Sequence, residues 1–183
     1  LGLSSVAKSY IAGLLQYAPE YMLITNQYVN SYKRLVPGFD APVVVSWGSR
    51  NRSAMVRVPR YKPSKPSSTR IAVRSVDSAA NPYLAYAAML GAGLKGIEEG
   101  LDLCAPVEEN LFKLSQAEIA ERGLKYLPRD LSQAIDEFEK SELMHEILGD
   151  VICENLISAK RAEWEEYRAH VSSWEIDRYL ARL

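Results

Sequence analysis

Basic and acidic residues are distributed unevenly along this chain of 183 residues. Between Asn30 and Arg74 there are ten basic residues and one acidic residue, Asp40, which gives a net charge of +9. The whole chain carries −1, so the other residues together carry about −10. The ten cations are Lys33, Arg34, Arg50, Arg52, Arg57, Arg60, Lys62, Lys65, Arg70 and Arg74. The first part of the chain is therefore expected to hold an anion site or a basic surface, and the rest an acidic body.

The basic segment also has the pattern of β-strands. Residues 43–47 are β-rich and residues 54–58 alternate, and the short polar link between them predicts an antiparallel hairpin. A loop rich in Pro, Ser and Lys follows over 59–68, and a third strand is expected over 69–75. Two or three strands are too few for an independent sheet, so we expect them to belong to a larger one.

Helical patterns occupy most of the remainder. The spacing of apolar residues and the capping residues predict helices over about 5–17, 22–35, 82–100, 150–168 and 174–183, and shorter ones that begin near Ser115, Asp130 and Ser141. On the long helix, Ile152, Leu156, Ala159 and Trp164 are expected to face inward. The predicted fold class is α+β, with a partial antiparallel sheet followed by a mostly helical C-terminal half.

The strand pattern places arginines on one face of the predicted sheet. Side chains alternate in a strand, so Arg70, Ala72 and Arg74 share a face. In the preceding strand, Arg57 lies on the face opposite the apolar Val56. The loop that joins the first two strands adds Arg50 and Arg52.

Three explanations fit this cluster of arginines. A solvated strand face with scattered ion pairs would need acids from the helical body, because acids are scarce nearby. A nucleic-acid surface uses the same charge, but the segment has few stacking aromatics and no known nucleic-acid motif. A small anion, such as a nucleotide phosphate or an amino-acid carboxylate, suits the planar guanidinium fork. Composition and spacing do not say which anion.

Other residue types exclude several classes of site. Cys104 and Cys153 have no metal-ligand spacing and are expected to be reduced thiols of a cytoplasmic protein, and His145 and His170 are isolated. No apolar run approaches the roughly 20 residues of a membrane span, and no signal peptide is visible. The first residue is Leu1 rather than Met, so the chain is expected to be a fragment.

Four motifs resemble the catalytic domain of type I glutamine synthetases, in order and at family-like spacing. They are Asn30-Ser31-Tyr32-Lys33-Arg34-Leu35-Val36-Pro37-Gly38, Arg50-Asn51-Arg52-Ser53-Ala54, Asn81-Pro82-Tyr83-Leu84, and the ending that contains Glu163-Trp164-Glu165-Glu166 and Trp174-Glu175. The resemblance covers residues 1–183 as the C-terminal portion of that domain, without the upstream metal-ligand strands and the N-terminal domain.

The resemblance implies an activity and a role for each arginine. The family joins ammonia to glutamate through γ-glutamyl phosphate, using ATP and two divalent metals, Mg²⁺ or Mn²⁺. Arg34 and Arg74 would bind glutamate, and Arg52, Arg57 and Arg70 would contact ATP. Arg52 and Asp40 are the expected catalytic residues. The partners implied are glutamate, ammonium, ATP and further copies of the subunit, in a cytoplasmic dodecamer of two hexameric rings.

Three positions depart from the family pattern. Asp40 stands where the family usually has Glu on the flap over the ammonium site. Ala72 stands where a Glu usually binds a metal, so no metal ligand is expected here. Phe112 stands where some bacterial members carry an adenylylated Tyr. Two alternatives therefore remain beside glutamine synthesis: a γ-glutamyl ligase for another amine, and a non-catalytic homologue. The isolated chain is predicted to be inactive.

Overall fold

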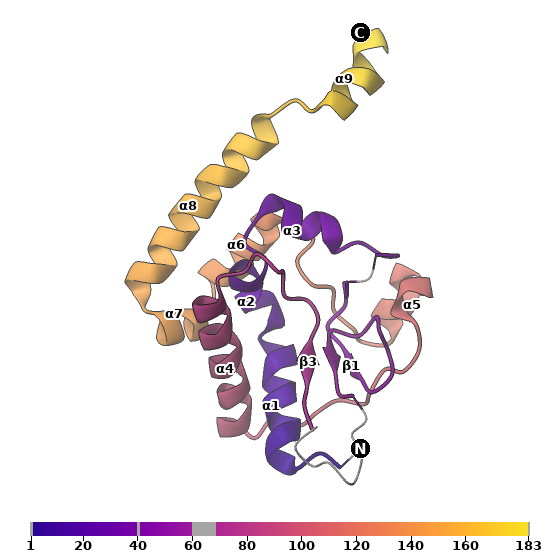
Figure 1. The fold of residues 1–183 in the computed structure, drawn as a ribbon, viewed down its shortest axis with the longest axis vertical. Coiled ribbons are helices and arrows are strands. Elements are labelled where there is room, and N and C mark those ends of the chain that lie inside the picture. The colour runs from indigo at the N-terminus through magenta and orange to yellow at the C-terminus, as the bar shows by residue number, and fades with distance from the viewer. Residues whose placement is uncertain (1, 40, 60–68, 183) are drawn as a thin grey trace.

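The described part of the chain, residues 2–39, 41–59 and 69–182 of a computed structural model, combines helices with a small sheet (Figure 1). The elements are α1 (Ser5–Gln16), α2 (Ala18–Thr25), α3 (Val29–Arg34), β1 (Trp47–Gly48), β2 (Val56–Arg57), β3 (Ala72–Val73), α4 (Pro82–Glu98), η2 (Leu111–Lys113), α5 (Gln116–Glu121), α6 (Leu131–Glu139), α7 (Glu142–Leu148), α8 (Asp150–Ala169), α9 (Ser173–Tyr179) and η3 (Leu180–Arg182). The predicted α+β class is confirmed.

Helices begin where the capping residues predict them. The Ser4 hydroxyl accepts a hydrogen bond from the Ala7 N–H at the start of α1, and the Asp130 carboxylate accepts one from Gln133 at the start of α6. Asn81 caps α4, whose first residue is a proline. These side chains satisfy amide groups that have no partner within the helix, so local sequence determines where each helix starts.

Glycines let α1 and α4 cross at close range beside the sheet (Figure 1). A Cβ at Gly13 would lie 2.2 Å from the carbonyl oxygen of Ala92 and 2.9 Å from the Cα of Gly96. Both of those atoms belong to the backbone and cannot rotate away. Glycine is therefore required where the two helices meet, and the buried Ile11 and Leu14 of α1 join the core there.

The predicted antiparallel hairpin is wrong. β1 and β2 pair in parallel, with Trp47 opposite Val56 and Gly48 opposite Arg57. The preceding residues pair elsewhere: Val44 forms an antiparallel bridge with Tyr126, and the Val45 N–H donates to Lys125 at 2.8 Å. Because this distant segment takes the hydrogen bonds of residues 43–45, the link after β1 does not fold back as a hairpin turn. The third strand is antiparallel to β2, as expected, but shorter.

Two helix predictions also need correction. The helix expected over 22–35 is interrupted after Thr25 and resumes as α3, because the backbone of Asn26 leaves the helical region. On α8, the side chain expected to be inward at Ile152 is 43% exposed, and Ala159 is exposed as well. Leu156 and Trp164 are partly buried against the core. The described helical body covers only part of the apolar stripe of α8.

The C-terminal helices extend away from the rest of the molecule (Figure 1). α8 leaves the helical body, and α9 carries exposed Trp174, Ile176 and Tyr179. No helix in the described residues is long and apolar enough to cross a membrane. The loop expected over 59–68 lies outside the described residues apart from Pro59.

Candidate functional site: an arginine-lined sheet edge

The pairing of β2 with β3 places arginines on one face. Arg57 lies directly opposite Ala72, and the Arg74 N–H donates to the Met55 carbonyl at 2.8 Å. Residues that are paired, or two apart, share a face of a sheet, so Arg57, Ala72 and Arg74 lie together. Val56 pairs with Val73 on the other face, and Val56 is completely buried. This register agrees with the faces expected from the sequence.

Arg34 reaches the same region from the end of α3. Its Nη2 donates to the carbonyl oxygens of Ser75 at 2.7 Å and Val76 at 3.2 Å, which follow Arg74 in the chain. The Nε of Arg34 is buried and has no hydrogen-bond partner within the described part of the chain. The tertiary structure therefore brings Arg34 next to the segment that carries Arg74, although 40 positions separate them in the sequence.

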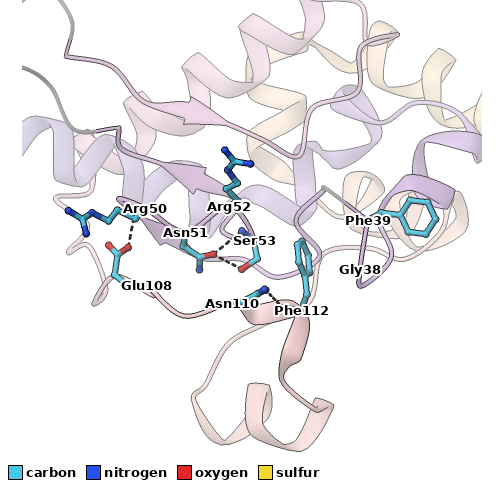
Figure 2. A pocket seen from close by; sticks show the side chains of 9 residues that line it. All are labelled: Gly38, Phe39, Arg50, Asn51, Arg52, Ser53, Glu108, Asn110 and Phe112. Atoms are coloured by element: carbon cyan, nitrogen blue, oxygen red, sulfur yellow. Dashed lines mark hydrogen bonds between the residues drawn. The ribbon is translucent and has the colours of Figure 1, made fainter.

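The loop that contains Arg50 and Arg52 is held by its neighbour along residues 107–111. The Asn51 Nδ2 donates to the carbonyls of Val107 at 2.9 Å and Glu109 at 2.6 Å, and its Oδ1 accepts from the Ser53 N–H at 2.8 Å. Buried Ser53 in turn accepts from the Leu111 N–H. With its middle residue anchored in this way, the loop presents both arginine side chains to solvent, where they point in different directions (Figure 2).

Glu108 holds the start of this loop. One carboxylate oxygen accepts hydrogen bonds from the Ser49 N–H at 2.8 Å and its hydroxyl at 2.7 Å, and the other accepts from the Arg50 N–H at 3.0 Å. Partial burial raises the pKa of Glu108, but these hydrogen bonds outweigh burial and lower it below its ordinary value. The carboxylate therefore stays ionised and fixes the loop backbone.

A cavity of about 430 Å³ opens between this loop, the segment around Phe112 and the residues before Asp40 (Figure 2). It is lined by Gly38, Phe39, Arg50, Asn51, Arg52, Ser53, Glu108, Asn110 and Phe112. Its lining combines polar residues with Phe112, whose ring stands beside Ser53 and Asn110 in Figure 2, and its volume suits a small ligand.

The structure places most of the predicted site residues close together. Arg57 and Arg74 lie on one face of the β2–β3 pair, Arg34 reaches the end of that pair, and we call these three residues the β2–β3 edge. Arg52 lies on the adjoining loop. Arg70 is exposed just before β3. Asp40 lies outside the described residues, so the predicted flap carboxylate is not placed.

The described residues offer no place for a metal ion by themselves. They contain no group of three or more His, Cys, Asp or Glu side chains that could hold one. His145 contacts Asp150 at 2.8 Å, and Cys104 and Cys153 are not joined to each other. Ala72, at the centre of the arginine face, has no donor atom. An anion fits better, because the Nε of Arg57 is buried there without a hydrogen-bond partner among the described residues.

Sequence reasoning missed two acidic residues that organise this site. Glu108 fixes the arginine loop, and Asp77 lies close enough to Arg34 to interact with it electrostatically. Asp77 is the first acidic residue after the basic segment, and this position was the only sign in the sequence that it lies near the arginines. Both contacts join residues more than 40 positions apart, so no local pattern contains them.

Comparison with known proteins gives the same family throughout. Residues 1–179 match the family described as "Glutamine synthetase, catalytic domain". The chain is 51% identical to a glutamine synthetase of Mycolicibacterium smegmatis, over 99% of this chain and 41% of that protein, and 48% identical to one of Methanosarcina mazei, over 99% and 40%. It thus spans about two fifths of the length of these curated relatives.

Solved structures agree with the sequence matches. A structure described as a GmaS/ADP complex superposes with a TM-score of 0.84 at 34% identity, over 99% of this chain and 41% of that one. A ligand-free GmaS structure gives a TM-score of 0.80 at 33% identity, over 98% and 39%. The family match spans nearly the whole chain, so the resemblance seen in the four motifs is confirmed, and the chain belongs to the glutamine synthetase catalytic-domain family.

Proposed function

We propose that residues 1–183 form the C-terminal portion of the catalytic domain of a longer ligase, which joins ammonia to glutamate at the expense of ATP. The observation that supports this most is the arrangement at the β2–β3 edge. Arg34 hydrogen-bonds to the residues directly after Arg74, and Arg57 lies one strand away on the face of Arg74. Such an edge can hold a carboxylate and a phosphate side by side.

The arginines then act by binding and charge stabilisation. Arg34 and Arg74 hold the glutamate substrate, while Arg52, Arg57 and Arg70 contact the phosphates of ATP. The γ-carboxylate oxygen of glutamate takes the terminal phosphoryl group and ADP leaves. Ammonia next attacks the γ-carbonyl carbon, phosphate departs with the C–O bonding electrons, and a proton is lost from nitrogen. Arginines stabilise the charge that develops on the transferred group, which is a main source of rate in phosphoryl transfer.

Asp40 and the cofactors complete the proposal. Asp40 binds ammonium and accepts its proton. Mg²⁺ or Mn²⁺, when bound, neutralises phosphate charge, and its ligands come from residues other than those described above. Use of a nucleotide is supported by the similarity to a protein solved in complex with ADP. We also propose a cytoplasmic location and a dodecamer of two hexameric rings.

The test is an assay of the longer protein for glutamine formed from glutamate, ammonium and ATP. Arg74→Ala and Arg57→Ala are expected to lower kcat/KM about 100-fold or more, because each removes charge stabilisation at the reacting groups. Arg168→Ala is the matched control, since this exposed arginine of α8 pairs only with the nearby Glu165 in the described structure. Equal activities in all three variants would refute the assignment of the arginines, and no glutamine from the unaltered protein would refute the reaction.

A second candidate function is γ-glutamyl transfer to a larger amine. The cavity of about 430 Å³ beside Gly38 and Phe39 favours it, because this space adjoins the position of Asp40 in the chain. The ring of Phe112 stands in its wall, where it can contact an alkylammonium ion. The same assay with methylamine, ethylamine and ethanolamine in place of ammonium decides between the two. A higher kcat/KM for one of these amines than for ammonium identifies the second function.

The remaining candidate is a non-catalytic homologue, and Ala72 is the observation that favours it. Ala72→Glu is the informative variant, because it restores a carboxylate opposite Arg57. Activity that appears only in Ala72→Glu would identify the unaltered protein as non-catalytic.

A further inference from the structure

The Asp77 carboxylate lies near Arg34, the arginine that we propose binds the glutamate substrate, and hydrogen bonds hold Asp77 in place. The Asp77 Oδ1 accepts a hydrogen bond from the Ala79 N–H at 2.9 Å, and the hydroxyls of Ser31 and Ser78 lie near enough to the carboxylate to lower its pKa. The Asp77 N–H donates to the Thr25 carbonyl at 2.9 Å. Asp77 is therefore fixed by the end of α2 and by its own turn, with Ser31 of α3 beside it.

Ser31 connects this carboxylate to the helix that carries Arg34. It is buried, lies three residues before Arg34 on α3, and accepts from the Tyr28 N–H at 3.2 Å. Residues three apart lie on the same side of a helix, so Asp77 faces the side of α3 from which Arg34 extends. The hydroxyl of Ser31 thus closes the start of α3 and lies near the Asp77 carboxylate.

The interaction between Asp77 and Arg34 is electrostatic rather than a direct ion pair. Partial burial raises the pKa of Asp77, but the Ser31 hydroxyl, the Ala79 N–H and then the charge of Arg34 together lower it below its ordinary value. The hydrogen bonds that Arg34 makes run instead to the carbonyls of Ser75 and Val76. A guanidinium has five N–H donors, so these two bonds leave others for a ligand.

We propose that Asp77 is a positioning residue for substrate binding: it offsets the charge of half-buried Arg34 and holds its guanidinium on the Ser75–Val76 backbone while leaving the remaining donors open to the glutamate carboxylate. This inference rests on the proposed function. A carboxylate in direct contact would compete with the substrate for the same donors. Held by its hydrogen bonds with Ala79 and Thr25, Asp77 supplies the charge without that competition.

The test is a set of variants in the longer protein. Asp77→Asn removes the charge but keeps an oxygen that can accept from the Ala79 N–H. Its KM for glutamate is expected to rise about tenfold, equivalent to about 1.4 kcal/mol, with the KM for ATP and the melting temperature nearly unchanged. Ser31→Ala should shift the KM for glutamate in the same direction by less. Asp102→Asn, at an exposed position, is the matched control.

The outcomes separate this inference from the proposed function. If the unaltered protein makes glutamine and Asp77→Asn leaves the KM for glutamate within twofold, the positioning role is wrong while the proposed function stands. Equal increases in the KM values for glutamate and ATP, with a lower melting temperature, would show a purely structural role and also overturn it. If the unaltered protein makes no glutamine, titration calorimetry with glutamate on the same variants decides. Tenfold weaker glutamate binding by Asp77→Asn than by the unaltered protein supports the role. Equal glutamate binding by the two proteins, or no binding by either, refutes it.

Discussion

At the scale of single residues, Asn51 is the anchor of the arginine loop. Its side chain is buried and makes hydrogen bonds to Val107, Glu109 and Ser53. Asn51→Ala leaves two backbone carbonyls and an amide without this partner, so the free energy of unfolding is expected to fall by about 2–3 kcal/mol. Urea denaturation measures it. Asn155→Ala on exposed α8 is the control, because it also removes an amide-to-carbonyl hydrogen bond, to Val151. Equal losses for both variants would mean that Asn51 does not anchor the loop.

Glu108 makes the same loop sensitive to acid. Its pKa is lowered in the folded protein, so its contribution to stability is complete above the ordinary pKa of 4.5 and is lost as the pH falls through the lower, folded value. Glu108→Gln cannot titrate. The melting temperature of the unaltered protein should therefore fall more steeply below about pH 5 than that of this variant. Glu166→Gln, on the exposed surface of α8, should keep the steeper fall. Parallel curves for the protein and Glu108→Gln would contradict the prediction.

Sequence could predict part of this arrangement because alternation along a strand is local information. The shared face of Arg57, Ala72 and Arg74 follows from period-two alternation once the strands are recognised. The electrostatic interaction between Arg34 and Asp77 does not, since it depends on how α3 packs beside the end of β3. Charge composition predicted an anion site or a basic surface, but not which acids would support it.

At the scale of elements, the crossing of α1 and α4 depends on glycine. Gly13→Ala places a methyl group 2.2 Å from the Ala92 carbonyl oxygen, and neither helix backbone can yield locally. The variant is expected to destabilise the protein by about 1–3 kcal/mol, or more if the helices separate. Lys8→Ala, on the exposed side of α1, should leave the melting temperature unchanged. Because alanine favours helix over glycine, a more stable Gly13→Ala would show that the helices do not meet there.

The wrong hairpin prediction shows that a sequence pattern can identify a strand without identifying the strand with which it pairs. Residues 43–47 and 54–58 have the composition of strands paired in a hairpin, yet residues 43–45 pair with residues 125–127, about 80 positions later. Only the end of the first segment pairs with the second, and it does so in parallel. Alternation tells which residues favour a strand but not which strand provides the partner. The exposed apolar stripe on α8 has the same origin, because periodicity marks an apolar face without naming the surface that covers it.

At the scale of the whole molecule, the C-terminal helices carry apolar side chains that the rest of the described structure does not cover. α8 projects from the body (Figure 1). α9 and η3 carry large apolar side chains that are exposed to solvent. Trp174 is 59% exposed and Leu180 is 67% exposed. Burying each such side chain contributes roughly 1.5–3 kcal/mol, so a segment with several of them gains substantially by docking. In the described structure this segment does not fold back on the body.

The proposed dodecamer provides a surface for these side chains, namely a subunit of the opposite ring. Deletion of residues 174–183 from the longer protein is expected to separate the two rings while leaving the arginine edge intact, because β2, β3 and α3 lie in the body and not in this arm. Size-exclusion chromatography with light scattering at low micromolar protein measures the change in mass. Trp174→Ala combined with Leu180→Ala should weaken the assembly in the same direction, whereas Glu166→Ala on α8 should not. Because subunit association depends on concentration, a truncated protein that still reassembled at higher concentration would agree with the docking role. If the truncated protein remained a dodecamer on dilution to nanomolar concentration, the contacts between the rings would lie elsewhere.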